Sequence, residues 1–96
     1  MIARLWRGSA ADAAKADAYQ RHVKTRVLPE LRRIPGHRGA QVLRRETEFL
    51  VITFWDSMEA IRRFAGDDPE RAVVEPEAQA VLSDYDDFVR HYEVQE

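Results

Sequence analysis

The chain has 96 residues, of which 45% are hydrophobic and 33% are charged, and its formal net charge is −2. This length suits one domain with one core, and the composition is that of a folded globular protein. The weak negative charge lacks the basic excess typical of proteins that bind nucleic acids or anionic membranes. We therefore expect a single domain spanning residues 1–96, with no nucleic-acid or membrane partner.

The sequence contains no cysteine, which excludes disulfides, thiolate nucleophiles, Cys-based zinc sites and iron–sulfur clusters. Residues 1–8 carry two arginines and no apolar run long enough for a signal peptide. No later segment approaches the roughly 18 apolar residues of a membrane span. These features predict a cytoplasmic protein.

The first third of the sequence predicts a strand followed by a long helix. Residues Ile2–Gly8 vary with a period near two and end in glycine, which is typical of a strand. Between residues 11 and 31, apolar side chains recur three or four positions apart, as in an amphipathic helix: Ala16, Tyr19, Val23, Val27 and Leu31. Because Pro29 lacks an N–H and clashes with the preceding turn, we expect a kink or a short second helical piece near Leu28.

Two β-prone segments follow, His37–Arg45 and Phe49–Trp55, around the polar residues 46–48. They predict an antiparallel hairpin whose turn type is left open, because the turn contains neither Asn-Gly nor Asp-Gly. A second helix is predicted to begin at Asp56 or Ser57. Its capping box would join Asp56 to Glu59, and its apolar face would end before glycine 66: Met58, Ile61, Phe64 and Ala65.

The last third of the sequence is less regular. Residues 67–86 are expected to form a loop with one or two helical turns, which the prolines at positions 69 and 76 could begin. Residues Phe88–Val94 return to the alternation of a strand. The predicted order is therefore βαββαβ, the α+β ferredoxin-like fold, with a four-stranded antiparallel sheet and both helices on one face.

The strand at Phe49–Trp55 also predicts how the chain associates. Apart from Thr53, the residues of both its faces are apolar or aromatic, whereas a sheet with one solvated face would alternate apolar with polar residues. Two helices can cover only one face, so we expect the other face to pack on a second copy in a two-fold homodimer. The alternative is a monomer with a partly exposed apolar strand.

Four segments carry a resemblance to a known family: Met1–Gly8, Ile34–Gly39, Phe54–Ala60 and His91–Val94. Together they make the sequence resemble uncharacterised members of the antibiotic-biosynthesis monooxygenase family. The resemblance implies a dimeric α+β barrel of ferredoxin-like domains. Some members oxidise aromatic polyketide phenols with dioxygen and without a cofactor, some relatives degrade haem, and others have no assigned activity.

The resemblance argues against the haem-degrading branch. Those relatives combine an asparagine on the first strand, a tryptophan on the second helix and an axial histidine shortly after that helix. Here the first strand has no asparagine, the helical aromatic residue is Phe64, and residues 65–83 contain no histidine to ligate iron.

The resemblance instead implies a cofactor-independent monooxygenase that acts with dioxygen on a small aromatic or polyketide-like substrate. The alternatives are a non-catalytic dimeric domain, which binds a small ligand or serves in stress, and another small-molecule reaction on the same scaffold. Oxygenation without a cofactor needs a dry pocket, a base and groups that stabilise an electron-rich anion. The residues that could supply these are His91 and Arg4 as catalytic groups, and Trp6, Trp55, Phe64 and Tyr92 as substrate-binding groups.

Each of these assignments has a structural alternative. His91 could be a general base or a buried neutral histidine held by a hydrogen bond. Arg4, on a predicted central strand, could bind a ligand anion or form an ion pair with a carboxylate such as Glu93. The tryptophans could stack a planar substrate or simply fill the core.

No metal site or cofactor is predicted. His22 and His37 lack the spacing of a shared ligand pair. The acidic residues near positions 67–68 and 84–87 lack calcium-loop spacing, so they are expected to form solvated loops.

Overall fold

The structure is a computed structural model that describes residues 1–96. Along the chain its elements are β1 (Ile2–Ser9), α1 (Ala13–His22), the π-helical turn η1 (Val23–Val27), α2 (Leu28–Leu31), β2 (His37–Arg45), β3 (Glu48–Trp55), α3 (Met58–Ala65), α4 (Pro76–Val81), β4 (Asp84–Tyr85) and β5 (Arg90–Glu93). None of the helices has the length and apolar character needed to cross a bilayer.

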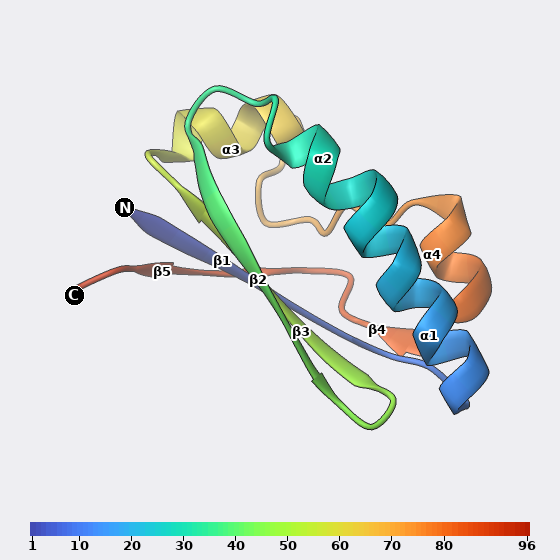
Figure 1. Ribbon diagram of the computed structural model, residues 1–96. Helices are drawn as coiled ribbons and strands as arrows, with labels where there is room; N and C mark the ends of the chain where they lie inside the picture. Colours follow the sequence, from blue (N-terminus) through green and yellow to red (C-terminus); the bar gives the residue numbers. More distant parts are fainter.

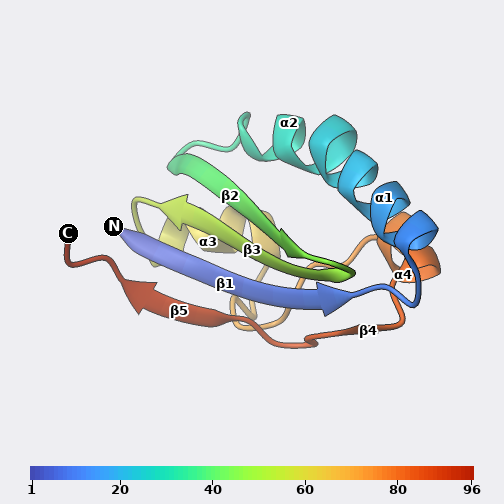
Figure 2. The same ribbon diagram turned by 60° about the horizontal axis from the view of Figure 1, so that its bottom comes forward.

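The sheet confirms the predicted α+β, ferredoxin-like fold. Its strands are ordered β2-β3-β1-β4, all pairings are antiparallel, and β5 also pairs with β1 (Figure 2). In this register Arg4 on β1 lies opposite Thr53 on β3 and opposite His91 on β5. The central strand therefore places Arg4 and His91 side by side on one face of the sheet.

The predicted final strand, Phe88–Val94, is shorter in the structure, where β5 spans Arg90–Glu93. Residues 86–89, between β4 and β5, form no strand with β1. In this segment the Val89 N–H donates to the Glu70 carbonyl at 2.7 Å, and the Ala72 N–H donates to the Asp87 carbonyl at 2.8 Å. The backbone of residues 87–89 thus satisfies its hydrogen bonds with the loop at 70–72 and not with β1. The same loop is thereby brought next to the edge of the sheet.

All the α-helices lie on the same face of the sheet (Figure 1). The predicted helix at 11–31 is divided into α1, η1 and α2, and α2 is the expected short second piece. The Leu28 N–H donates to the Val23 carbonyl, five residues back. This wider turn directly precedes Pro29, which has no N–H of its own to donate.

The predicted hairpin and second helix are confirmed as β2, β3 and α3. The cap of α3 is Ser57, whose hydroxyl accepts the Ala60 N–H at 3.2 Å. The predicted capping box with Asp56 is therefore wrong. The Asp56 carboxylate instead accepts two hydrogen bonds from Arg38, at 2.7 and 2.8 Å.

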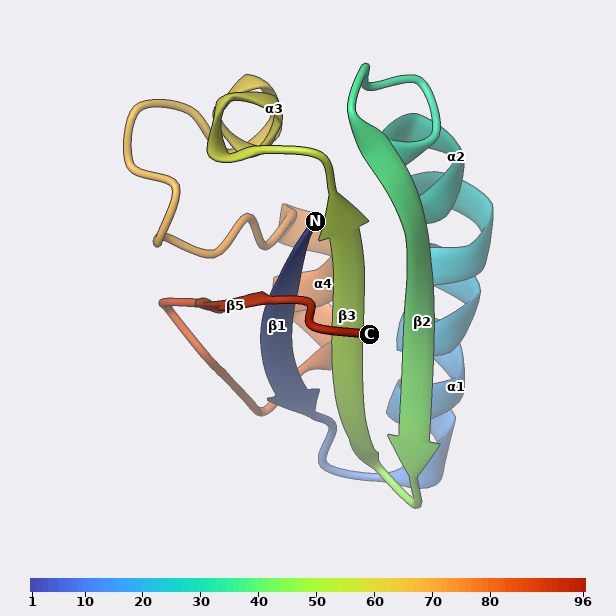
Figure 3. The ribbon, with the colours of Figure 1, turned by 90° about the vertical axis from the view of Figure 1, so that its left-hand side faces the viewer.

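The two faces of the sheet differ in what covers them. The helix-covered face buries Phe49, Thr53 and Trp55 of β3, and two hydrophobic clusters lie between it and the helices. No helix covers the opposite face, which Figure 3 views directly. On that face Leu43 is 47% exposed and Tyr92 52% exposed, and we call it the open face.

Candidate functional site

A cavity of about 450 Å³ lies on the helix-covered face and is lined by residues of both hydrophobic clusters. Its side against the sheet comes from Arg4 and Trp6 of β1 and from Val51 and Thr53 of β3. Eleven of its seventeen lining residues are hydrophobic. A mostly apolar cavity with a few polar groups is typical of a small-molecule site.

Arg4 is the one charged residue that the fold buries, with 4% of its surface exposed. Its guanidinium donates to the Pro69 carbonyl and, at 3.0 Å, to the Arg71 carbonyl. It forms no ion pair with a carboxylate, so the alternative pairing with Glu93 is wrong. Burial lowers the pKa of Arg4 to about 10, which still leaves the side chain charged at neutral pH.

The hydrogen bonds of Arg4 leave part of its donor capacity unused. A guanidinium carries five N–H groups, and contacts to Pro69, Arg71 and His91 account for three of them. A buried cation without a carboxylate partner, and with donors to spare, is suited to hold an anionic group of a ligand.

His91 lies beside Arg4 but does not line the cavity. Its Nε2 is 3.1 Å from Nη1 of Arg4. Because a guanidinium can only donate, Nε2 must accept and the ring proton is assigned to Nδ1. Burial and then the charge of Arg4 lower the pKa of His91, while the charge of Glu70 opposes them. The nitrogen that a general base would use is therefore already engaged.

The four aromatic residues predicted to bind substrate lie in three different places. Trp6 and Phe64 line the cavity, and the Trp6 indole N–H donates to the Asp86 carbonyl at 2.9 Å. Trp55 does not line the cavity. It is fully buried and stacks on Phe64 with ring centres 5.7 Å apart. Tyr92 lies on the open face, because it is one position from His91 on a strand whose side chains alternate. It does not join the cavity.

Glycine at position 8 allows Trp6 to take this place. A Cβ on Gly8 would lie 2.5 Å from the Trp6 ring, closer than any side chain could approach without displacing it. The indole therefore lies over Gly8, two residues further along β1, and contacts Tyr19, with ring centres 5.9 Å apart. Substituting this glycine would move a wall of the cavity.

The structure also brings together a group that sequence reasoning missed. His22 of α1 approaches Glu75 and Glu77 at the start of α4, and their ligand atoms all lie within 4.8 Å of one another. His22 and Glu75 also line the cavity. More than fifty positions separate these residues in the sequence, and the contact depends on the loop whose course was least predictable, so no spacing could have signalled it.

Comparisons with known proteins agree with this architecture. A search of curated proteins finds no match. Among solved structures, a variant of SnoaB, a cofactor-independent oxygenase from Streptomyces nogalater, matches with a TM-score of 0.72 and 15% identity, over 99% of this chain and 93% of that one. The haem degrader MhuD from Mycobacterium tuberculosis matches with a TM-score of 0.67 and 18% identity, over 100% and 97%.

A protein of Deinococcus radiodurans described as an antibiotic biosynthesis monooxygenase matches with a TM-score of 0.68 and 19% identity, over 100% of this chain and 94% of that one. At such low identities these likenesses establish the fold alone. The model of the antibiotic biosynthesis monooxygenase family matches residues 7–76, well over half of the sequence. The chain therefore belongs to the antibiotic-biosynthesis monooxygenase family.

Proposed function

We propose that this chain is a cofactor-independent oxygenase that binds a small, acidic hydroxyaromatic or polyketide-like molecule in the cavity and oxidises it with dioxygen. Family membership supports the reaction class. The observation that carries the substrate class is Arg4, a buried cation that lines the cavity without a carboxylate partner. Its charge would favour the ionised form of a bound phenol, which is the electron-rich form that reacts with dioxygen.

The other groups of the cavity fit this role. Trp6 and Phe64 offer apolar faces to a planar ring, and Trp55 supports Phe64 from behind. His91 acts in this proposal as a positioning residue that fixes the guanidinium of Arg4, since its Nε2 accepts from Nη1. That engagement is also the observation that favours the alternative function, a binding domain without turnover, because it leaves no free base beside Arg4.

Oxygen uptake tests the proposal. A panel of hydroxylated naphthoquinones and anthracenones should include at least one compound that drives oxygen consumption by the metal-free protein. Arg4→Met should lower kcat/KM by roughly 10²- to 10³-fold, the usual cost of removing a group that stabilises a developing anion. The matched control is Arg21→Met, an exposed arginine of α1 with no side-chain hydrogen bond, which should leave turnover unchanged.

Two results would decide between the two functions, and a third would reject the cavity as the site. Oxygen uptake by the wild-type protein that is lost in the Arg4→Met variant supports the oxygenase. Ligand binding that Arg4→Met weakens, without oxygen uptake for any compound, supports the binding domain. If Arg4→Met and Arg21→Met behave alike in both assays, the cavity is not the site.

We also propose that the open face packs on a second copy of the chain. Along β3 that face presents Leu50, Ile52 and Phe54, which the fold leaves only half-buried, and no other part of the chain covers them. A sheet face of this kind is self-complementary about a two-fold axis, so a homodimer would bury it.

Light scattering should therefore give about twice 11.2 kDa at micromolar concentration. Ile52→Asp should shift the protein to monomer, because a carboxylate would otherwise be buried unpaired in the interface. Ala80→Asp, on an exposed position of α4, is the control and should remain dimeric. A monomeric wild-type protein would contradict the proposal.

A further inference from the structure

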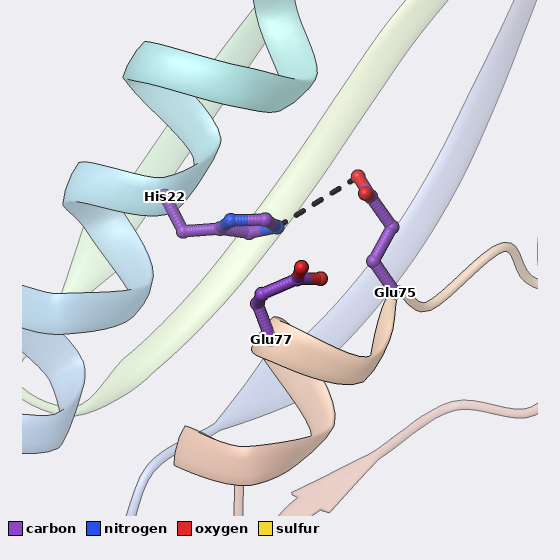
Figure 4. A group of neighbouring side chains, drawn as sticks. All are labelled: His22, Glu75 and Glu77. Carbon is purple, nitrogen blue, oxygen red and sulfur yellow. Dashed lines mark ion pairs between the residues drawn. The ribbon is translucent and has the colours of Figure 1, made fainter.

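A second polar group lies at the wall of the cavity, on elements that Arg4 does not touch. His22 projects from the end of α1, while Glu75 stands at the N-cap position of α4 without a capping hydrogen bond from its side chain, and Glu77 lies in the first turn of α4. Figure 4 shows the three side chains reaching toward one another from these two elements. Their potential ligand atoms, one imidazole nitrogen and two carboxylate oxygens, lie within 4.8 Å of one another.

The imidazole of His22 is buried but lacks a hydrogen-bond partner for Nε2. The side chain is only 10% exposed, and Nε2 is buried with no hydrogen bond to any protein atom. The nearest carboxylate oxygen, Oε1 of Glu75, lies at 3.7 Å, which is ion-pair distance (dashed line in Figure 4) but beyond hydrogen-bond distance. An unsatisfied buried nitrogen costs about 1–3 kcal/mol, so its retention calls for a partner outside the chain.

The charges around this nitrogen indicate what the partner is. Two carboxylates face one imidazole, and neither Glu75 nor Glu77 forms an ion pair with a lysine or an arginine. Their mutual repulsion favours a cation between them. A neutral imidazole nitrogen together with two carboxylate oxygens is a ligand set for Zn²⁺ and related divalent transition ions.

We propose that His22, Glu75 and Glu77 bind a divalent transition-metal ion, for which Zn²⁺ is the probe. Tetrahedral zinc with ligand bonds of about 2.0–2.1 Å holds its ligand atoms about 3.4 Å apart. The 3.7 Å between Nε2 of His22 and Oε1 of Glu75 is close to that spacing, and the carboxylate of Glu77 lies within 4.8 Å of both residues' ligand atoms. Three protein ligands leave a coordination position for water or a bound molecule, and His22 and Glu75 place that position at the cavity.

Calorimetric titration tests this site without any substrate. The 96-residue chain, stripped with a chelator, should bind Zn²⁺ saturably with one ion per chain. Each of His22→Gln, Glu75→Gln and Glu77→Gln should weaken binding by more than roughly tenfold. Glu30→Gln is the matched control, because this glutamate also lines the cavity but lies outside the group, and it should bind as the wild type does. Zn²⁺ should also raise the Tm of the wild type and of the control variant only.

The two glutamate variants show whether a loss of Zn²⁺ binding comes from the removed ligand or from unfolding of the chain. Glu77 is exposed and Glu75 half-buried, so Glu75→Gln and Glu77→Gln should keep the wild-type circular dichroism spectrum even if His22→Gln does not. A visible absorption band with Co²⁺ that is lost in these two variants would add support. The proposal is overturned if Zn²⁺ binds more weakly than about 1 mM, or if all three variants bind it as the wild type does.

Discussion

Two histidines beside the same cavity have opposite hydrogen-bond states. Nε2 of His91 accepts a hydrogen bond from Arg4 at 3.1 Å, whereas Nε2 of His22 is buried and forms no hydrogen bond. The first imidazole completes an internal network around a buried cation. The second faces two carboxylates, which pair with no lysine or arginine, and its own contact with Glu75, at 3.7 Å, is too long for a hydrogen bond. The comparison teaches that a histidine's surroundings assign its role better than its strand or helix does: His91 is built to hold a protein group, and His22 to receive an external one.

Among the tests that compare the two histidines, the largest effect should come from the choice of replacement at His91. If His91 positions Arg4, then His91→Gln should retain activity within about threefold, because an amide oxygen can accept the same N–H, whereas His91→Ala should lose roughly tenfold or more. Steady-state oxygen uptake and its pH profile measure both. A general base would behave differently, with both variants inactive and the rise in kcat near neutral pH abolished.

The next effect is a pair of stability changes with opposite signs. His91→Leu should destabilise the fold by about 1.5–3 kcal/mol, because it removes a hydrogen bond to a charged donor inside the protein. His22→Leu, in metal-free protein, should be neutral or stabilising by about 1 kcal/mol, because it removes a buried polar atom that has no partner. Urea unfolding of the two variants gives both values. Equal destabilisation would show that His22 has a partner in solution that the structure lacks.

A smaller effect should appear in the pH dependence of stability. Burial and a nearby arginine lower the pKa values of His91 and His37 below that of a free histidine, near 6.5. The unfolded chain therefore binds more protons than the folded one just below that pH, so stability is present above about pH 6.5 and is lost as the pH falls toward the folded-state values. The Tm should drop as the pH falls below about 6.5, and His91→Gln should flatten part of the drop. An unchanged slope in the variant would assign the loss to other groups.

Periodicity predicted which face each strand residue occupies, but not the register between strands. The sequence leaves Arg4 with either a ligand anion or a carboxylate such as Glu93 on the last strand, whereas the structure puts His91 opposite it. A shift of two residues keeps a side chain on the same face, so a period of two cannot distinguish these partners. The hairpin and α3 are predictable because strand alternation and an apolar helix face are local patterns, although the cap of α3 is Ser57 and not Asp56.

The rest of the site depends on contacts between distant parts of the chain. The carbonyl groups of Pro69 and Arg71 that hold Arg4, and the carboxylate of Glu75 that faces His22, come from a segment expected only to be a loop. Their position follows from the pairing of residues 70–72 with residues 87–89. Such pairing leaves no periodic signal in the sequence. Candidate residues of the cavity could therefore be named from the sequence, but their arrangement in space could not be predicted.

The most direct test of the account compares the binding of two matched ligands. A hydroxylated naphthoquinone and its methyl ether share a ring system, but only the first can present an anionic oxygen. If Arg4 holds that oxygen, fluorescence titration should show the hydroxylated compound binding at least about tenfold more tightly than the ether, with its hydroxyl pKa lowered on binding, and Arg4→Met should remove both differences. Equal affinities of the two compounds for the wild-type protein would contradict the account.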